Sequence, residues 1–190
     1  MSDCLIVGGG VIGMMSARSL IMSGAEVTLT NELSFASQAV YEDICAQLYD
    51  NTGIDSEYLK SGLLMMDEYN SVEAINWMEK YKVSYQAHSK GALFENIAQA
   101  RNPRLLQALK ADIIKRGVKI IEHVEIDGVL TKANKAIGVS SKNKQYFANN
   151  IVVCSGAWSS KWLGLKEDIF PMKGQMIVIK SDANMVKHIV

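Results

Sequence analysis

Apolar runs and amphipathic segments alternate along the first part of the chain. Residues 4–7 form a short apolar run, which predicts a buried parallel strand. Residues 11–23 place apolar side chains at helical spacing ahead of Gly24, so a helix with a glycine stop is predicted there. The run 26–30 predicts a second strand. This order of strand, helix and strand is typical of the start of an α/β sheet.

The pattern then predicts several more elements. Helices are predicted at 38–49, from Ser71 onward and from Asn102–Pro103 to Arg116, with a strand at 62–66. Gly117 is expected to end the last of these helices. Beyond it the period changes to that of strands, which are predicted at 118–121, 126–131, 136–140, 146–148 and 151–154.

Three glycines follow the first predicted strand in the pattern G-x-G-x-x-G. Gly8 permits a tight turn, Gly10 lets a pyrophosphate approach the backbone, and Gly13 lets the helix pack closely on the strand. The first N–H groups of the helix, at Val11, Ile12 and Gly13, then face the phosphates with the positive end of the helix dipole. Strand, turn and helix together form the context that a dinucleotide site requires. The alternative is a glycine turn that only packs a helix on a sheet.

The second predicted strand ends in Asn31 and Glu32, where an acidic residue commonly binds the ribose of a dinucleotide. Asn31 has the expected spacing from the glycines and Glu32 is next to it, so either side chain could accept the ribose hydroxyls. Glu32 could equally be a solvated loop carboxylate. Because no Lys or Arg lies near this strand end, binding of a 2′-phosphate is not supported.

Composition excludes several classes of partner. The 190 residues are 48% hydrophobic, enough for one large domain or two small ones. The 20 basic and 20 acidic residues cancel, which leaves no electrostatic footprint for nucleic acid or an anionic membrane. The longest uncharged apolar stretch, residues 4–17, is shorter than the roughly 18 residues that span a bilayer, and no basic segment precedes it. We therefore expect a cytoplasmic protein with no membrane span and no signal peptide.

Cysteine and histidine usage predicts neither a disulfide set nor a metal site. Cys4, Cys45 and Cys154 are widely spaced in apolar elements, which is typical of buried reduced thiols. The three histidines lie far apart, with no Cys or carboxylate at ligand spacing, so we expect no bound metal.

The order of the motifs resembles the glycine oxidase and D-amino acid oxidase family of FAD-dependent oxidoreductases. The glycine turn and the S-G-A-W-S turn at 155–159, which follows the last predicted strand, occur in that family in the same order. Three further stretches are similar to family segments: N-P-R-L-L-Q-A-L at 102–109, E-H-V-E-I at 122–126 and P-M-K-G-Q at 171–175. Together the matches cover most of the chain.

The resemblance implies an α/β fold, with a Rossmann-like FAD-binding domain of the GR2 flavoprotein type and a second, smaller α+β substrate domain. It places the FAD-binding domain at 1–60 and 98–165, and part of the substrate domain at 61–97 and 166–190. The residues implied to hold FAD are Gly8, Gly10, Val11, Ile12, Gly13, Asn31, Glu32, Ile126, Ser155, Gly156, Ala157 and Trp158. Ile126 is the implied adenine contact. The backbone of Ala157 and Trp158 is expected beside the pyrophosphate or ribityl chain, with the Trp158 ring packed between the domains.

The implied activity is oxidation of the C–N bond of an amino acid or amine, as in the glycine oxidases of thiamine biosynthesis. Hydride passes to the flavin, the imine is hydrolysed, and oxygen reoxidises the flavin. The expected partner is a small amino acid or amine substrate, and a homo-oligomer is left open. An NAD-linked dehydrogenase and a non-catalytic nucleotide-binding module are the alternatives.

The catalytic residues are not identified by the sequence. In the family an Arg from the C-terminal half holds the substrate carboxylate. The arginines of this chain, Arg18, Arg101, Arg104 and Arg116, all lie on or beside helices of the expected flavin domain. None of them is a good substitute.

Two stretches are shorter than the family pattern. The loop that lies against the flavin is reduced to residues 33–37, and the connection at 86–90 is also short. We therefore expect the sequence to omit parts of a longer protein, with interruptions of the backbone within 31–37 and within 85–91. A continuous backbone at both places would indicate a shortened relative, for which an enzymatic role is less favoured.

Overall fold

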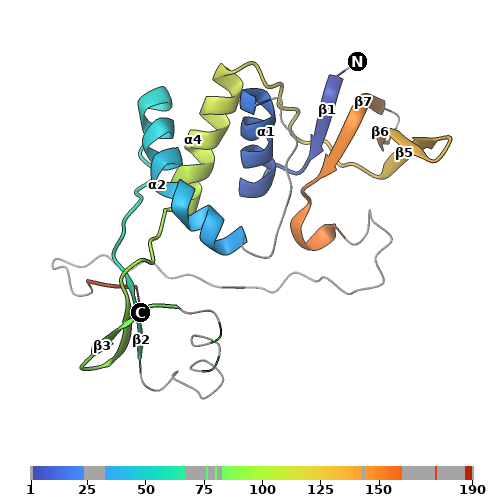
Figure 1. The fold of residues 1–190 in the computed structure, drawn as a ribbon. Helices are drawn as coiled ribbons and strands as arrows, with labels where there is room; N and C mark the ends of the chain where they lie inside the picture. Colours follow the sequence, from blue (N-terminus) through green and yellow to red (C-terminus); the bar gives the residue numbers. More distant parts are fainter. Residues whose placement is uncertain are drawn as a thin grey trace. The chain divides into compact units, whose positions relative to one another are not determined.

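The computed structural model describes residues 2–23, 33–66, 76, 80, 83–142, 144–159, 174 and 187–189. The chain divides into two compact units, one made of Met1–Thr28 and Leu106–Gln175 and the other of Leu29–Leu105 and Met176–Val190. Each unit has its own β-sheet (Figure 1). Among the described residues, no helix is both long enough and apolar enough to cross a membrane.

The first unit contains a four-stranded sheet in the order β1-β7-β6-β5. Its strands are β1 (Ser2–Val7), β5 (Gly128–Lys132), β6 (Lys135–Ser141) and β7 (Lys144–Val153). β7 pairs in parallel with β1 and antiparallel with β6, and β6 pairs antiparallel with β5. Val139 and Ala148 are each only 1% exposed and form part of the core of this unit. One long strand therefore joins the parallel part of the sheet to its antiparallel meander.

Helix α1 (Val11–Ser23) follows the glycine turn directly. Its first backbone bond runs from Met14 N–H to the Gly10 carbonyl at 3.0 Å, which makes Gly10 the N-cap residue. Ala17 and Arg18, two turns further along, are buried. The helix bounds are those that the apolar spacing predicts.

Helix α4 (Asn102–Lys115) crosses the division between the two units at Leu105 and Leu106. Its buried residues, at spacings of three and four, are Leu105, Ala108, Leu109, Asp112 and Ile113. At its end Gly117 takes φ +92° and its N–H bonds the Ile114 carbonyl, while Val118 N–H bonds the Ile113 carbonyl. This pair of bonds is a Schellman motif, which explains why the helix stops at the glycine.

Helices α1 and α4 lie side by side (Figure 1), and a buried ion pair links them. Arg18 Nε lies 3.1 Å from Asp112 Oδ2, and the two side chains are 7% and 1% exposed. Arg116, one turn after Asp112, places its Nε 2.8 Å from the same oxygen. The carboxylate therefore pairs with two guanidinium groups, of which Arg18 is buried and Arg116 is partly exposed.

The second unit contains helix α2 (Leu33–Thr52) and a three-stranded antiparallel sheet in the order β2-β4-β3. The strands are β2 (Leu63–Met66), β3 (Gln86–His88) and β4 (Gly91–Phe94). Ala92 and Phe94 are its buried centre, and partly buried apolar side chains pack against them. Ile189, near the end of the chain, bridges in parallel to Leu63.

The predicted elements are confirmed at β1, α1, β2, α4, β5 and β6, within a few residues at their ends. Residues 118–121, predicted as a strand, are irregular. The strands predicted at 146–148 and 151–154 are one strand, β7, because pairing with β6 and then β1 continues through both. The predicted strand 26–30 and the start of the helix after Ser71 lie outside the described residues.

The short stretches also differ from expectation. Residues 33–37 are the first turns of α2 rather than a loop, so this helix begins before the predicted position 38. The interruption expected within 85–91 is wrong, because β3 and β4 form a continuous hairpin in which His88 pairs with Gly91 across a two-residue turn. Residues 31 and 32 lie outside the described part of the chain.

Replacing Asp112 by Ala tests the buried ion pair. The change leaves the buried Arg18 without its carboxylate, so we expect a loss of about 3–5 kcal/mol in the free energy of unfolding. Urea denaturation of the two proteins measures the difference. Glu122→Gln is the control, because its ion pair with Lys110 is exposed and should contribute far less. Equal losses for the two variants would contradict the role of the buried pair.

Candidate cofactor site

The glycine turn and the turn at 155–158 lie side by side at one edge of the sheet. β1 and β7 run in parallel with Val7 opposite Val153, so both strands end at the same edge. Cys154 N–H donates to the Val7 carbonyl at 2.7 Å, which extends the pairing into both turns. The expected neighbourhood of these two motifs is thus confirmed.

Two of the three motif glycines are required by close backbone contacts. A Cβ on Gly8 would lie 2.1 Å from the Cys154 carbonyl oxygen, and Gly8 has φ +121°, which side chains rarely permit. A Cβ on Gly13 would lie 2.1 Å from the Gly8 carbonyl oxygen. These glycines let β1, β7 and α1 approach each other.

Gly10 differs from both of them. A Cβ built there would meet nothing within 4 Å, and the residue is exposed. Packing of the described chain therefore does not explain a glycine at this position. The open space lies at the N-terminus of α1, where the first-turn N–H groups have no helical acceptor. A pyrophosphate in that space would accept hydrogen bonds from the backbone, so the residues present fit a dinucleotide.

The second turn is a short 3-10 helix, Gly156–Trp158. Trp158 N–H bonds the Ser155 carbonyl at 3.1 Å, and the hydroxyls of Ser155 and Ser159 lie 3.2 Å apart. Trp158 is 64% exposed, and Ile12 in the first turn of α1 is 72% exposed. Large exposed apolar side chains beside an open polar cradle are suited to cover the apolar parts of a bound cofactor.

The electrostatics of the cradle favour an anion. No charged side chain occurs between Cys4 and Ala17, so this segment itself adds no carboxylate that would oppose the helix dipole and the N–H groups. Burial, and to a smaller degree the thiol of Cys154, raises the pKa of Cys4. The Cys4 thiol is therefore neutral at physiological pH and adds no negative charge to β1. Cys4, Cys45 and Cys154 are all free thiols, as predicted, although only Cys45 is fully buried.

The structure brings together nine of the predicted cofactor residues, which are Gly8, Gly10, Val11, Ile12, Gly13, Ser155, Gly156, Ala157 and Trp158. Ile126 lies in the irregular segment before β5, and its adenine contact stays a prediction. Asn31 and Glu32 lie outside the described residues. The packing of Trp158 between domains also stays a prediction.

The arginines have partners that sequence reasoning did not identify. Arg18 and Arg116 share Asp112. Arg101 Nη1 lies 3.0 Å from Glu57 Oε1, and Arg104 Nε lies 3.7 Å from the same oxygen. The spacing of Asp112 and Arg116, four residues apart on one helix, is a signal that could have predicted their pair. No sequence signal relates Arg18 to Asp112, because they are 94 positions apart along the chain. Within the described ranges, no group of three or more His, Cys, Asp or Glu side chains is placed to hold a metal ion.

A parallel strand pair, a glycine turn and an open helix N-terminus at one sheet edge define a dinucleotide-binding α/β protein. The family model for FAD dependent oxidoreductases of the DAO family matches residues 29–189. The chain belongs to this family, whose cofactor is FAD, and it has the family's α/β fold.

Individual relatives agree with this assignment. The chain is 28% identical to a glycine oxidase of Pseudomonas aeruginosa over 235 residues, which covers 98% of this chain and 65% of the relative. It is 24% identical to the bifunctional protein ThiO/ThiG of Nostoc sp., over 94% of this chain and 34% of that protein. The crystal structure of glycine oxidase from Bacillus cereus superposes with a TM-score of 0.73 at 20% identity, over 86% of this chain and 58% of that one.

The chain therefore spans less than two thirds of the length of the relatives it matches. The alignment with the Pseudomonas aeruginosa protein runs over 235 residues, more than the 190 of this chain, so the relative has residues without a counterpart here.

Gly13→Ala tests the close packing of α1 on the glycine turn. Because the new Cβ would overlap the Gly8 carbonyl oxygen, α1 must shift, and we expect a loss of about 1–3 kcal/mol in the free energy of unfolding. Chemical denaturation measures it. Unchanged stability would show that the turn adapts and that the close contact is not required.

Gly10→Val tests whether the glycine is needed for cofactor binding or for the stability of the fold. A Cβ at this position meets nothing within 4 Å, so we expect a folded protein that is less stable by about 1 kcal/mol at most, since Val is a poorer N-cap than Gly. FAD retention should be abolished, because the side chain occupies the phosphate position. Flavin content and a thermal melt, measured on one preparation, check both results. Normal flavin content in the folded variant would contradict the cradle.

Proposed function

We propose that this chain is the flavin-binding part of an enzyme that oxidises the C–N bond of an amino acid or amine. The observation that carries the proposal is the parallel pairing of β1 with β7, which places an open glycine cradle beside the 155–158 turn. Membership of the FAD dependent oxidoreductase family and the glycine oxidase names of the relatives support it. Family membership also favours FAD over NAD as the cofactor.

In this proposal each group of residues has a defined role. The N–H groups of Val11, Ile12 and Gly13 bind the pyrophosphate, and Gly10 leaves the space for it. The backbone at 155–158 lies along the pyrophosphate or ribityl chain, and Trp158 covers apolar surface between the domains. Asn31 or Glu32 accepts the ribose hydroxyls, and Ile126 contacts the adenine. When bound, FAD supplies the acceptor for a hydride from the substrate carbon.

Other parts of the proposal concern the whole protein. The FAD-binding domain comprises 1–60 and 98–165, and 61–97 with 166–190 belong to the substrate domain. The substrate is a small amino acid or amine, as the name of the glycine oxidase relatives suggests, and the enzyme works in the cytoplasm, where a role in thiamine biosynthesis is expected. A homo-oligomeric enzyme is compatible with this proposal.

One observation favours a second candidate, a nucleotide-binding module without catalysis. All four arginines have carboxylate partners within the described structure, so none of them is poised to hold a substrate carboxylate. In the catalytic proposal that Arg comes from elsewhere in the whole protein.

Titration with FAD and anaerobic addition of amines distinguish the two candidates. Bound oxidised flavin should turn the protein yellow, and glycine, sarcosine or a D-amino acid should bleach the flavin absorbance as the cofactor is reduced. Bleaching identifies both the reaction and the substrate. Binding of FAD without bleaching by any of these compounds would favour the non-catalytic module, and failure to bind FAD would overturn the proposal itself.

A further inference from the structure

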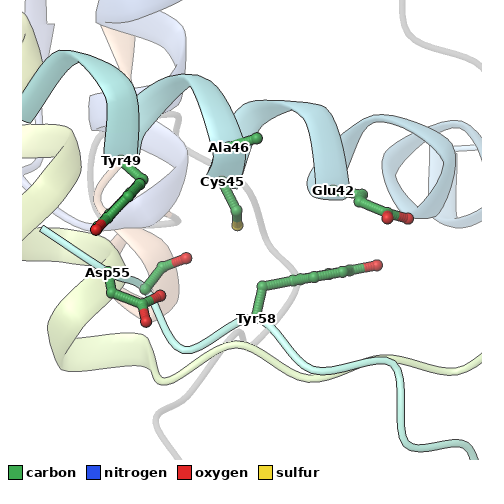
Figure 2. Close-up of a pocket in the computed structure, with 7 residues that line it drawn as sticks. Glu42, Cys45, Ala46, Tyr49, Asp55 and Tyr58 are labelled. Carbon is green, nitrogen blue, oxygen red and sulfur yellow. The ribbon is translucent and has the colours of Figure 1, made fainter. Parts of the chain in front are cut away.

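A cavity lies within the second unit, between α2 and the loop that follows it. Its volume is about 290 Å³, close to that of a small-molecule site. Figure 2 shows the side chains that line it. Those that matter are Glu42, Cys45, Ala46 and Tyr49 from α2 and Asp55 and Tyr58 from the loop.

The walls of this cavity are well fixed. Residues 42, 45, 46 and 49 recur at helical spacing and share one face of α2. The opposite wall is held by hydrogen bonds from backbone N–H groups: the Asp55 side-chain Oδ1 accepts from Glu57 N–H at 2.8 Å, and the Ser56 carbonyl accepts from Arg101 N–H at 2.9 Å. Leu59 and Gln99 exchange two further bonds. The space is therefore part of the folded unit and not a gap beside a loose loop.

The middle of the cavity is apolar. Cys45, which is 5% exposed, points into it from the helix, and the Tyr58 ring lies across from it (Figure 2). Ala46 adds a methyl group next to Cys45. Methylene groups placed here would be removed from water, which is favourable by about 0.8 kcal/mol for each one that is fully buried.

The two ends of the cavity are acidic. Glu42 lies toward one end and Asp55 toward the other (Figure 2). No Lys or Arg lines the cavity. Burial, then the negative charge of Glu42 and then that of Cys45, raise the pKa of Tyr58. Asp55 Oδ1 accepts from Glu57 N–H, and the Asp55 backbone carbonyl accepts from Arg104 Nε at 3.1 Å. Among the described residues Arg101 and Arg104 form their ion pairs with Glu57, so the Asp55 carboxylate itself is not in an ion pair with either of them.

We propose that this cavity binds a small organic diammonium ion, an aliphatic diamine, with one ammonium group at Glu42 and the other at Asp55. Carboxylates form strong charge-assisted hydrogen bonds with ammonium groups, and the tyrosine rings offer faces that attract cations. The apolar middle suits a methylene spacer. A divalent metal ion fits less well, because it needs several oxygen ligands around one point and not one carboxylate at each end. Residues 42 and 49 are seven positions apart, which is about 10 Å along the helix, so the ligand is extended.

Calorimetric titration of the whole chain with 1,5-diaminopentane tests the proposal. The matched probe is 1-aminopentane, which keeps the spacer and one charge. We expect the diamine to bind at least about tenfold more tightly than 1-aminopentane, because it forms one additional charge-assisted contact. The affinity for the diamine should fall as the salt concentration is raised. Mg²⁺ should not compete. Equal affinity for the two amines, or no binding of either, would overturn the proposal.

Variants locate the site. Glu42→Gln and Asp55→Asn should each weaken diamine binding about tenfold, to the level of the monoamine. Asp43→Asn is the control, since Asp43 is exposed on the same helix, loses the same charge and does not line the cavity. Thermal melts check folding, and FAD content should be unchanged in all three. An equal effect of Asp43→Asn would show only general charge attraction and would contradict a specific site.

Discussion

The candidate cofactor site depends on one interaction, the parallel pairing of β1 with β7. The two strands come from opposite ends of the first unit's sequence, and the bond from Cys154 N–H to the Val7 carbonyl carries their pairing into the turns beyond them. Because parallel strands end at the same edge, the glycine turn and the 155–158 turn must be neighbours. Their closeness in turn demands Gly8, since any Cβ there would enter the backbone of residue 154.

The glycines of the motif serve different physical purposes, although the sequence pattern treats them alike. Gly8 and Gly13 are needed because backbone atoms of the protein lie too close for a side chain, whereas Gly10 borders open space. The distinction separates what the fold needs from what a ligand needs. It also explains how a site for an anion forms without any basic side chain, because N–H groups and a helix dipole supply the attraction.

Charged residues away from the cradle are organised by pairing. Asp112 pairs with two arginines, one of them on α1, and Glu57 pairs with two more near the start of α4. These pairs give the arginines structural roles and remove them from consideration as substrate ligands. Glu42 and Asp55 are different, since they face a cavity without a cationic side chain in its lining.

Local signals in the sequence were sufficient for much of this fold. The bounds of α1, the stop of α4 at Gly117 and the glycine cradle follow from residue types and spacings of a few positions, because the contacts that cause them are local. The tertiary structure alone decided the rest. Residues 118–121 have the composition of a strand but are not paired as one, and β7 is a single strand because its two halves find different partners. The Arg18–Asp112 pair and the cavity beside α2 join positions that no short pattern relates. Strand pairing, ion pairing and cavities depend on which distant segments meet in the folded chain. A short sequence pattern does not show which segments these are.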